Sequence, residues 1–371
     1  MSIIERRIEF LRNSMESANI DTLLVLVGEN RFYLSGFSAQ DHQYDESAGA
    51  LIITQNQLLL ATDSRFELQA KDESPQYEVV IYKNGLAKAL PHLLKRLDSR
   101  RLGFEEARLS YYQYRQLKVE LEKASFSVEL VPLEDFVEKF RLIKSSQEIE
   151  LTRQALEVAE QVFRRVVKKM APGMTEKALA WDMERGMRED GADDISFPII
   201  VAGGPNSALP HAVPTDRPIA AGEPILFDWG ARLNAYCSDT SRTVILGPAD
   251  DTFKKVHHTV LEAQKRAIAA ITSGASTKAV DAAARAFIHS EGFEGRFGHG
   301  TGHGTGLAVH EGPRLSPLKE TKLEAGMIVT VEPGIYLADW GGVRIENQVV
   351  VRKNGSDVLN RLSTAYQVDQ I

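Results

Sequence analysis

Five residues in the second half of the sequence could together hold metal ions. Three of them, Asp228, Glu332 and Glu346, stand within apolar segments typical of β-strands, Asp239 follows Asp228 by eleven residues, and His303 lies in the glycine-rich segment GHGTGHGTG. A carboxylate in an apolar strand is costly unless it is paired or binds a cation, and clustered carboxylates repel one another. Two divalent cations would neutralise four such charges. Ligands so rich in oxygen favour Mn(II), with Co(II) or Zn(II) as alternatives.

Simpler interpretations exist for each of these residues. A single acid at a strand end is most often solvated or paired in a salt bridge, so only the combination indicates a metal site. The glycine-rich segment could be a phosphate-binding loop, but it lacks both the G-x-x-x-x-G-K-[ST] pattern and the Rossmann spacing. Glycines beside a ligand histidine instead allow close backbone approach. His299, His303 and His310 fall within this region, whereas His257 and His258 are predicted on the surface of a helix.

The acids occupy matching places in an internal repeat. Segments 172–191 and 273–292 align with a constant offset of 101 residues, and each combines a glycine, a capping hydroxyl (Thr175 or Ser276) and a helix that closes on glycine. Further on, PILFDWG parallels MIVTVEPG, which matches Asp228 with Glu332 at an offset of 104. A duplicated unit is expected to pack about a pseudo-two-fold axis, on which equivalent acids converge.

Two domains are predicted to position these residues. Residues 1–138 alternate between helical and strand patterns, as in the helical spacing over 3–18 and the apolar run over 21–28, which is typical of a three-layer α/β domain. Residues 139–371 form the second domain, in which the internal repeat predicts a duplicated α/β unit. It opens on a long helix that we expect Ser146 to cap and that ends at Ala171-Pro172-Gly173.

Composition excludes several classes of protein. The 371 residues are 43% hydrophobic and 26% charged, with a formal net charge of -7, which argues against a general nucleic-acid-binding protein. The single cysteine, Cys237, allows no intrachain disulfide and fits a reducing compartment. Neither a signal peptide nor an apolar run long enough to span a membrane is found. The sequence therefore predicts a cytoplasmic enzyme with no membrane or nucleic-acid partner.

The sequence resembles the pita-bread metallopeptidases, in particular the aminopeptidase P and prolidase branch. The resemblance is carried by NSALPHAVPTDR, FDWGARLNAYCSDTSRT, HGTGHGTGLAVHE, TVEPGIY and GVRIEN, with weaker echoes in GFSAQ and ATDSRFELQA. It implies a creatinase-like α/β domain over 1–138 and a pita-bread catalytic domain of α+β class over 139–371. Departures are Ala235 before Tyr236, Asp239-Thr-Ser-Arg242 in place of Asp-x-Thr-Arg, and the bulky Trp229, which would narrow the cleft.

The resemblance also implies roles for individual residues. Two metal ions would be held by Asp228, Asp239, His303, Glu332 and Glu346. Of these, Asp239 and Glu346 would bridge the two ions. His211 would face the substrate, His310 would hydrogen-bond the scissile carbonyl or the tetrahedral intermediate, and His299 would line the same cleft. Arg344 would position a bridging carboxylate or the substrate from outside the ligand set.

The expected reaction is hydrolysis of the Xaa-Pro bond at the amino terminus of a peptide (aminopeptidase P) or of a dipeptide (prolidase). A hydroxide bridging two metals would attack the carbonyl carbon, His310 would stabilise the oxyanion, and Glu332 would carry the proton to the leaving nitrogen. The preference for proline and a homodimeric state rest on the resemblance alone. Alternatives are a methionine aminopeptidase-like enzyme, a creatinase-like hydrolase that works without metal, and a non-enzymatic binding protein. The extra N-terminal domain disfavours the first of these, and the complete ligand set disfavours the other two.

Overall fold

The computed structural model describes residues 2–41 and 47–370. Its contacts divide the chain into two compact units, Met1–Phe140 and Arg141–Ile371, which are described separately. Among the described residues, no helix is both long enough and apolar enough to cross a membrane.

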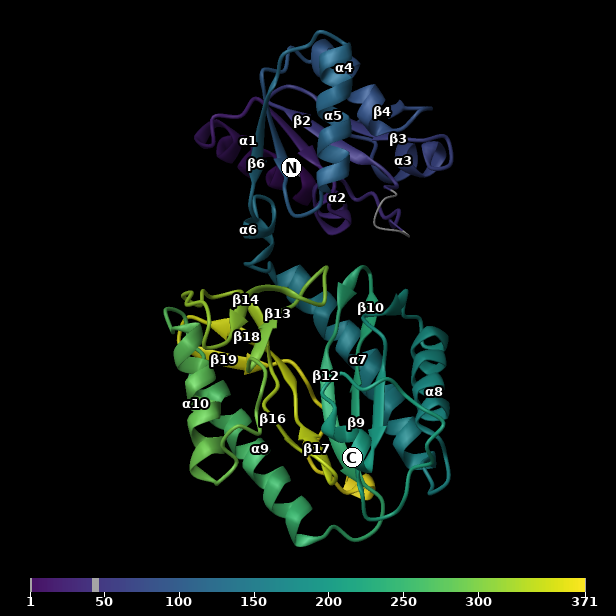
Figure 1. Ribbon diagram of the computed structural model, residues 1–371, viewed down its shortest axis with the longest axis vertical. Coiled ribbons are helices and arrows are strands. Elements are labelled where there is room, and N and C mark those ends of the chain that lie inside the picture. The colour runs from purple at the N-terminus through teal and green to yellow at the C-terminus, as the bar shows by residue number, and fades with distance from the viewer. Residues whose placement is uncertain (1, 42–46, 371) are drawn as a thin grey trace. The chain divides into compact units, whose positions relative to one another are not determined.

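The N-terminal unit is built on a six-stranded sheet with strand order β4-β3-β2-β1-β5-β6 (Figure 1). Strand β2 runs antiparallel to β1 and β3, while the pairs β1–β5, β3–β4 and β5–β6 are parallel. Both β1 and β2 are buried almost throughout, as in a sheet covered on both faces. This agrees with the predicted α/β class. The elements are α1 (Ile3–Ser17), β1 (Thr22–Val25), α2 (Gly28–Ser35), β2 (Ala50–Thr54), β3 (Leu58–Thr62), α3 (Glu67–Glu73), β4 (Glu78–Ile81), α4 (Leu86–Arg96), β5 (Arg101–Glu105), α5 (Tyr111–Lys123), β6 (Glu129–Leu133) and α6 (Glu138–Arg141).

The C-terminal unit combines four long helices with short antiparallel sheets, as the α+β prediction requires. Its first half contains α7 (Ser146–Lys169), α8 (Glu176–Glu189), β7 (Asp194–Ile195), β8 (Ile200–Gly203), the 3₁₀ helix η1 (Gly204–Ala208), β9 (Pro224–Trp229), β10 (Ala231–Leu233), β11 (Tyr236–Cys237) and β12 (Thr240–Ile245). Its second half contains α9 (Asp251–Ala269), α10 (Thr277–Ser290), β13 (Gly302–Gly304), β14 (Glu311–Leu315), β15 (Ile328–Val331), β16 (Gly334–Leu337), β17 (Gly341–Arg344), β18 (Asn347–Arg352), β19 (Gly355–Val358) and η2 (Val368–Gln370).

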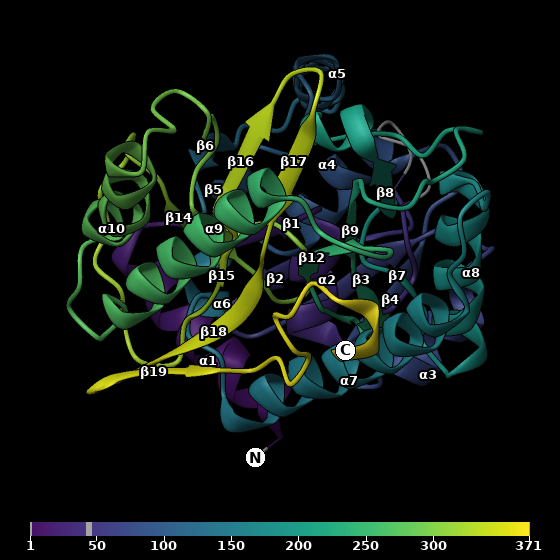
Figure 2. The ribbon, with the colours of Figure 1, turned by 90° about the horizontal axis from the view of Figure 1, so that it is seen from below.

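The two halves repeat one another, as the offsets in the sequence predict. Helices α8 and α10 begin and end 101 residues apart, and the antiparallel triplet β8-β9-β12 has its counterpart in β13-β15-β18. An isolated bridge joins Thr175 to Pro218 in the first half and Ser276 to Lys322 in the second. Figure 2 shows α8 and α10 at opposite sides of the unit with the strands between them.

Trp229 does not narrow the site, contrary to the prediction. Its side chain is fully buried, stacks on Phe163 with ring centroids 4.2 Å apart, and donates a hydrogen bond from Nε1 to the Ala159 carbonyl at 3.0 Å. Successive side chains of a strand point to opposite faces. Trp229 therefore points into the core beneath α7, while its neighbour Asp228 points the other way.

Two predicted helix caps also need correction. The cap of α7 is Ser145 and not Ser146, because Ser145 and Glu148 form a reciprocal capping box, a motif that requires the acid three residues after the cap. In the repeat, Thr175 caps α8 by accepting a hydrogen bond from the Ala178 amide, whereas Ser276 precedes α10 without a capping bond from its side chain.

His257 is buried and does not lie on the surface as predicted. Only 4% of its surface is exposed, and its ring packs against Phe253 and Tyr366. Burial lowers the pKa of His257 to about 4, so the ring is neutral at neutral pH. The adjacent His258 is exposed, as expected.

Candidate metal centre

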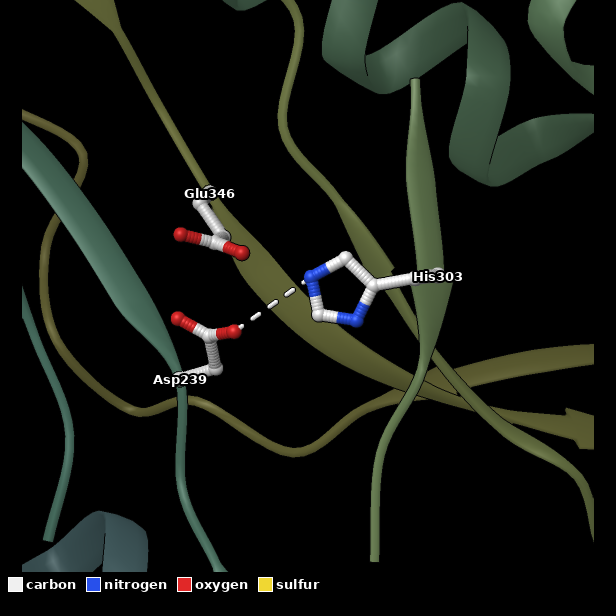
Figure 3. A group of neighbouring side chains, drawn as sticks. All are labelled: Asp239, His303 and Glu346. Carbon is white, nitrogen blue, oxygen red and sulfur yellow. Dashed lines mark ion pairs between the residues drawn. The ribbon is translucent and has the colours of Figure 1, made fainter. Parts of the chain in front are cut away.

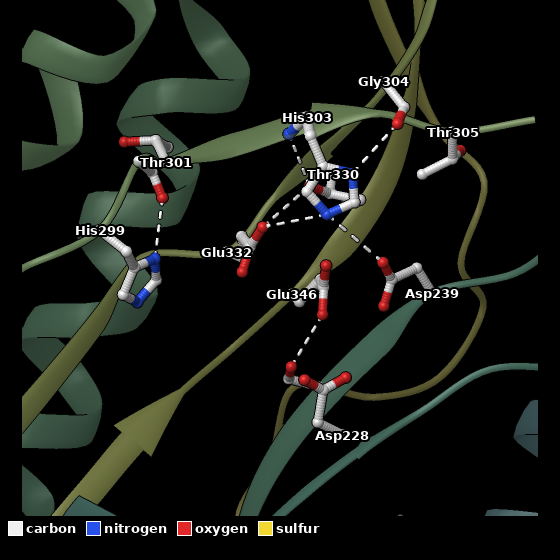
Figure 4. Close-up of polar contacts among 12 residues, drawn as sticks. Asp228, Asp239, His299, Thr301, His303, Gly304, Thr305, Thr330, Glu332 and Glu346 are labelled. Carbon is white, nitrogen blue, oxygen red and sulfur yellow. Dashed lines mark hydrogen bonds and ion pairs between the residues drawn. The ribbon is translucent and has the colours of Figure 1, made fainter. Parts of the chain in front are cut away.

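Two antiparallel strand pairs bring the four acids together. Asp228 lies in β9 directly opposite Ser241 in β12, and Asp239 immediately precedes β12. Glu332 follows β15 and Glu346 precedes its partner β18. The Glu346 amide donates a hydrogen bond to the Ser241 carbonyl at 3.1 Å. This bond joins the two halves of the repeat near their acids. Figure 4 shows the four acids together with His303.

The distances are those of a ligand cluster. Asp239, His303 and Glu346 each offer one ligand atom, and these atoms all lie within 4.8 Å of one another (Figure 3). The Nε2 atom of His303 is 3.5 Å from Oδ2 of Asp239 and 3.4 Å from Oε1 of Glu332. Asp228 is close enough for its charge to raise the pKa of Asp239, Glu332 and Glu346. The structure therefore places all five predicted ligands around one point.

Without a cation, this cluster strongly favours protonated carboxylates. Burial raises the pKa of Asp239 and of Glu346 well above the usual range, and the charges of the neighbouring carboxylates raise both further. Burial and the charge of Asp228 raise the pKa of Glu332 to about 7. Among the described residues, Oδ1 of Asp228 and Oε1 of Glu346 are buried and accept no hydrogen bond. Acceptor-only oxygens of this kind fit a site for divalent cations.

His303 is held in the orientation that a ligand needs. Its Nδ1 lies 3.0 Å from the Gly304 carbonyl, which makes Nδ1 the donor and leaves the lone pair of Nε2 facing the acids. Burial lowers the pKa of His303 to about 3, so the ring is neutral. A Cβ atom at Gly302 would lie 2.0 Å from the Thr330 carbonyl oxygen, and one at Gly304 would lie 1.8 Å from that of Gly312. The glycines thus allow close backbone approach, as predicted.

Arg344 connects the acids of both halves. Its Nη2 donates to Oδ2 of Asp228 at 2.6 Å, and its Nε donates to Oγ of Ser241 at 2.8 Å. Ser241 in turn donates to Oε2 of Glu346 at 2.7 Å. Arg344 therefore contacts one predicted ligand directly and reaches a second through a hydroxyl group.

Tyr336 is a member of this network that the sequence analysis missed. Its hydroxyl accepts a hydrogen bond from Nη1 of Arg344 at 2.8 Å and lies 2.9 Å from Nε2 of His299. The β16–β17 hairpin places it there. Tyr336 occurs in the segment TVEPGIY, but no rule of spacing assigns a tyrosine four residues after a ligand to this position.

The three remaining predicted histidines lie near the acids but differ in exposure. His299 is partly buried, and burial lowers its pKa to about 4, with Arg344 contributing. His310 is exposed, and its ring meets that of His303 edge-on at 4.3 Å. His211 is exposed too, and its charge lowers the pKa of both His299 and His310. All three therefore share one electrostatic environment.

A buried ionic triad fixes the segment that carries His310. Glu311 pairs with Arg141 and with Lys144, whose Nζ lies 3.0 Å away, and all three side chains are at most 7% exposed. Burial alone would raise the pKa of Glu311, but Lys144 and Arg141 lower it below its usual value. Glu311 also accepts a hydrogen bond from the Ala308 amide at 3.1 Å, which closes the turn before His310.

Replacing Glu311 by glutamine is expected to lower the free energy of unfolding by about 3 kcal/mol, because two buried cations lose their counter-charge. Denaturant unfolding of the Glu311→Gln variant measures this loss. Glu324→Gln, a matched change at an exposed acid, is expected to stay within about 0.5 kcal/mol of the parent protein. Equal stability of both variants would contradict the proposed importance of the triad.

Known proteins show the same two-part organisation. Residues 150–353 match metallopeptidase family M24, and residues 7–143 match the creatinase/prolidase N-terminal domain. An Xaa-Pro dipeptidase of Pyrococcus horikoshii is 34% identical over 97% of this chain and 98% of its own length. The structure of an Xaa-Pro dipeptidase from Bacillus anthracis superposes with a TM-score of 0.91 at 35% identity, covering 98% of this chain and 99% of that one. An X-Pro aminopeptidase from Thermotoga maritima gives 0.86 at 36% identity, over 96% and 99% of the two chains. The chain therefore belongs to metallopeptidase family M24 and is a metallo-exopeptidase in which a creatinase/prolidase N-terminal domain precedes the catalytic domain.

Proposed function

We propose that the protein hydrolyses the Xaa-Pro bond at the amino terminus of small peptides, with dipeptides as its preferred substrates. The convergence of four carboxylates and one neutral imidazole, with two buried oxygens that accept no hydrogen bond, is the observation that supports a dinuclear metal site. The choice of proline and of dipeptides draws on the similarity to Xaa-Pro dipeptidases.

Two divalent ions, Mn(II) in our proposal, would supply Lewis-acid polarisation of the scissile carbonyl and a water molecule of lowered pKa. Asp228, Asp239, His303, Glu332 and Glu346 would hold them. Glu332 would accept the proton of the water and pass it to the leaving nitrogen, since its Oε1 faces the centre beside His303. His310 would donate a hydrogen bond to the developing oxyanion. Arg344 would keep Asp228 oriented through their hydrogen bond.

The substrate assignment predicts that Ala-Pro is cleaved and that Ala-Pro-Ala is cleaved at least about tenfold more slowly in kcat/KM. Release of free alanine by the Mn(II)-loaded enzyme measures both rates, and Ala-Ala serves as the control for proline. Faster cleavage of Ala-Pro-Ala would identify an aminopeptidase P instead. Inertness toward both proline peptides, with cleavage of Ala-Ala, would remove the proline assignment altogether.

Three further assignments accompany this proposal. We propose Mn(II) over Co(II) and Zn(II) because the ligand set is dominated by carboxylates. A homodimer and a cytoplasmic location complete the proposal. Light scattering of the purified full chain tests the homodimer, and cell fractionation tests the cytoplasmic location.

A further inference from the structure

The N-terminal unit contains a cavity of about 470 Å³ that the proposed peptidase reaction does not use. It lies on the face of the sheet that α4 and α5 cover (Figure 1), and every residue that lines it belongs to this unit. Its volume falls in the range of small-molecule sites. Its apolar walls are formed by Leu24, Leu26, Leu86, Leu90, Leu109 and Leu117.

The cavity opens where ligands bind in many α/β sheets. Strands β1, β3, β4 and β5 all point the same way, and the residues that follow their carboxyl ends line the opening. The chain moves outward from β1 to β4 and then crosses back to β5 on the other side of β1. Adjacent strands whose connections leave in opposite directions create a crevice at their carboxyl ends, and this cavity lies at that point.

Three of the charged side chains that line the cavity are already paired. Arg65 donates to both carboxylate oxygens of Asp63, at 2.8 Å from Nη2 and 3.0 Å from Nε. Arg108 lies 3.4 Å from Oδ2 of Asp41. Asp41 also pairs with the buried Arg31 at 3.1 Å, so one carboxylate serves two guanidinium groups here. The remaining charged side chain of the lining is a lysine.

That lysine, Lys83, forms no salt bridge with any residue of the ranges 2–41 and 47–370, and it lies three residues before Leu86, the first residue of α4. The capping position of α4 is Gly85, so no side chain satisfies the amides of the first turn. The neighbouring Tyr82 lines the cavity, and its hydroxyl makes no hydrogen bond within the same described ranges. One cation, one open helix end and one hydroxyl donor therefore stand at the mouth of an apolar cavity.

We propose that this cavity binds a small organic acid, with an aromatic or branched apolar body between α4 and α5 and its carboxylate at Lys83 and the first turn of α4. A single unpaired cation matches a monoanion, which favours a carboxylate over a phosphate dianion. The apolar walls, without a further unpaired charge, favour a body that carries no second ionised group. This binding is independent of the proposed peptidase activity.

Binding of N-acetyl-L-phenylalanine to the full-length, metal-loaded protein tests the proposal, measured by ligand-detected NMR. The matched probe N-acetyl-L-phenylalaninamide has the same body without the charge and is expected to bind at least about fivefold more weakly. Lys83→Ala is expected to weaken binding of the acid by a similar factor. Ala87→Trp, which fills the cavity between the helices, is expected to abolish it.

Lys88→Ala is the matched control, since Lys88 is an exposed lysine of α4 that does not line the cavity. Hydrolysis of Ala-Pro and the midpoint of thermal unfolding verify that each variant is folded. Equal binding of the acid and the amide, or equal binding by Lys83→Ala and Lys88→Ala, would overturn the proposal. Tighter binding of phenyl phosphate than of N-acetyl-L-phenylalanine would overturn the assignment to a carboxylate. Binding that Ala87→Trp leaves intact would show that the acid binds elsewhere.

Discussion

Replacing Glu332 by glutamine is expected to leave a folded protein whose kcat with Ala-Pro is lower by about 10²–10⁴. Glutamine keeps the size of the side chain and its carbonyl oxygen, but it cannot accept and release the proton that we assign to Glu332. It also removes one negative charge from the proposed metal site. Steady-state kinetics of the Mn(II)-loaded variant measure the loss.

Metal content separates the two roles of Glu332. Elemental analysis that finds two ions in Glu332→Gln, together with low kcat, would assign the loss to proton transfer. Loss of one ion would assign it to ligation. Glu320→Gln, a control at an exposed acid of the same domain, is expected to keep the activity of the parent protein. Turnover by Glu332→Gln equal to that of the control would eliminate Glu332 from the mechanism.

Removal of the metal ions is expected to abolish activity and to make stability depend on pH in a specific direction. In the metal-free fold the pKa of Glu332 is raised to about 7, and the pKa values of Asp239 and Glu346 are raised further. Above the ordinary pKa of these acids, the folded state then binds more protons than the unfolded state. Stability due to the acids therefore falls as pH rises.

Buried histidines oppose this trend at lower pH. The pKa of His257 and of His299 is lowered to about 4 and that of His303 to about 3. They therefore add stability as pH rises toward the ordinary value of about 6.5 and add nothing beyond it. Above that pH these histidines change nothing further, while the three acids still do, as does the buried Glu105 of the N-terminal unit, whose pKa burial raises to about 7. Urea unfolding of the chelator-treated protein should therefore show stability falling from pH 6.5 to 8.

Mn(II) is expected to remove the part of this dependence that Asp239, Glu332 and Glu346 contribute, because cations hold these carboxylates ionised in the folded state. The contribution of Glu105 remains. At a hundredfold excess over its dissociation constant, each ion adds about 2.7 kcal/mol to the free energy of unfolding. The comparison requires unfolding curves at pH 6.5 and 8, with chelator and with Mn(II). A metal-free protein that gains stability over this interval would contradict the arrangement of charges described above.

The proposed ligands could be identified from the sequence because each of them depends on a local pattern. Asp228 and Glu346 interrupt apolar segments of the sequence. A carboxylate buried in such a strand is costly unless it is paired or binds a cation. The repeat then matches Glu332 with Asp228, which indicates that they converge. The α/β class of the N-terminal domain follows from its alternation of strand and helix patterns, whereas the class of the catalytic domain is predicted from the resemblance to a known family.

The features that could not be predicted from the sequence depend on contacts between distant segments. The pattern of helix α9 predicts an exposed position for His257, but the ring of Tyr366, more than a hundred residues later in the sequence, packs against it. Tyr336 acquires its place only when the β16–β17 hairpin reaches Arg344. The direction of Trp229 depends on which face of β9 meets α7, and the spacing of apolar residues in a strand buried on both sides leaves that choice open.

The hydrogen bond between Glu346 and Ser241 joins the two halves of the catalytic domain, and this bears on the order in which the chain folds and binds its ions. Asp228 and Asp239 come from the first half of the catalytic domain, while His303, Glu332 and Glu346 come from the second. Neither half alone carries all five proposed ligands, so we expect uptake of both ions only after the two halves have docked. Bound ions would then link the two halves of the catalytic domain. If the chain is cut in the connection 246–250, we expect the two fragments to stay associated while the ions are bound.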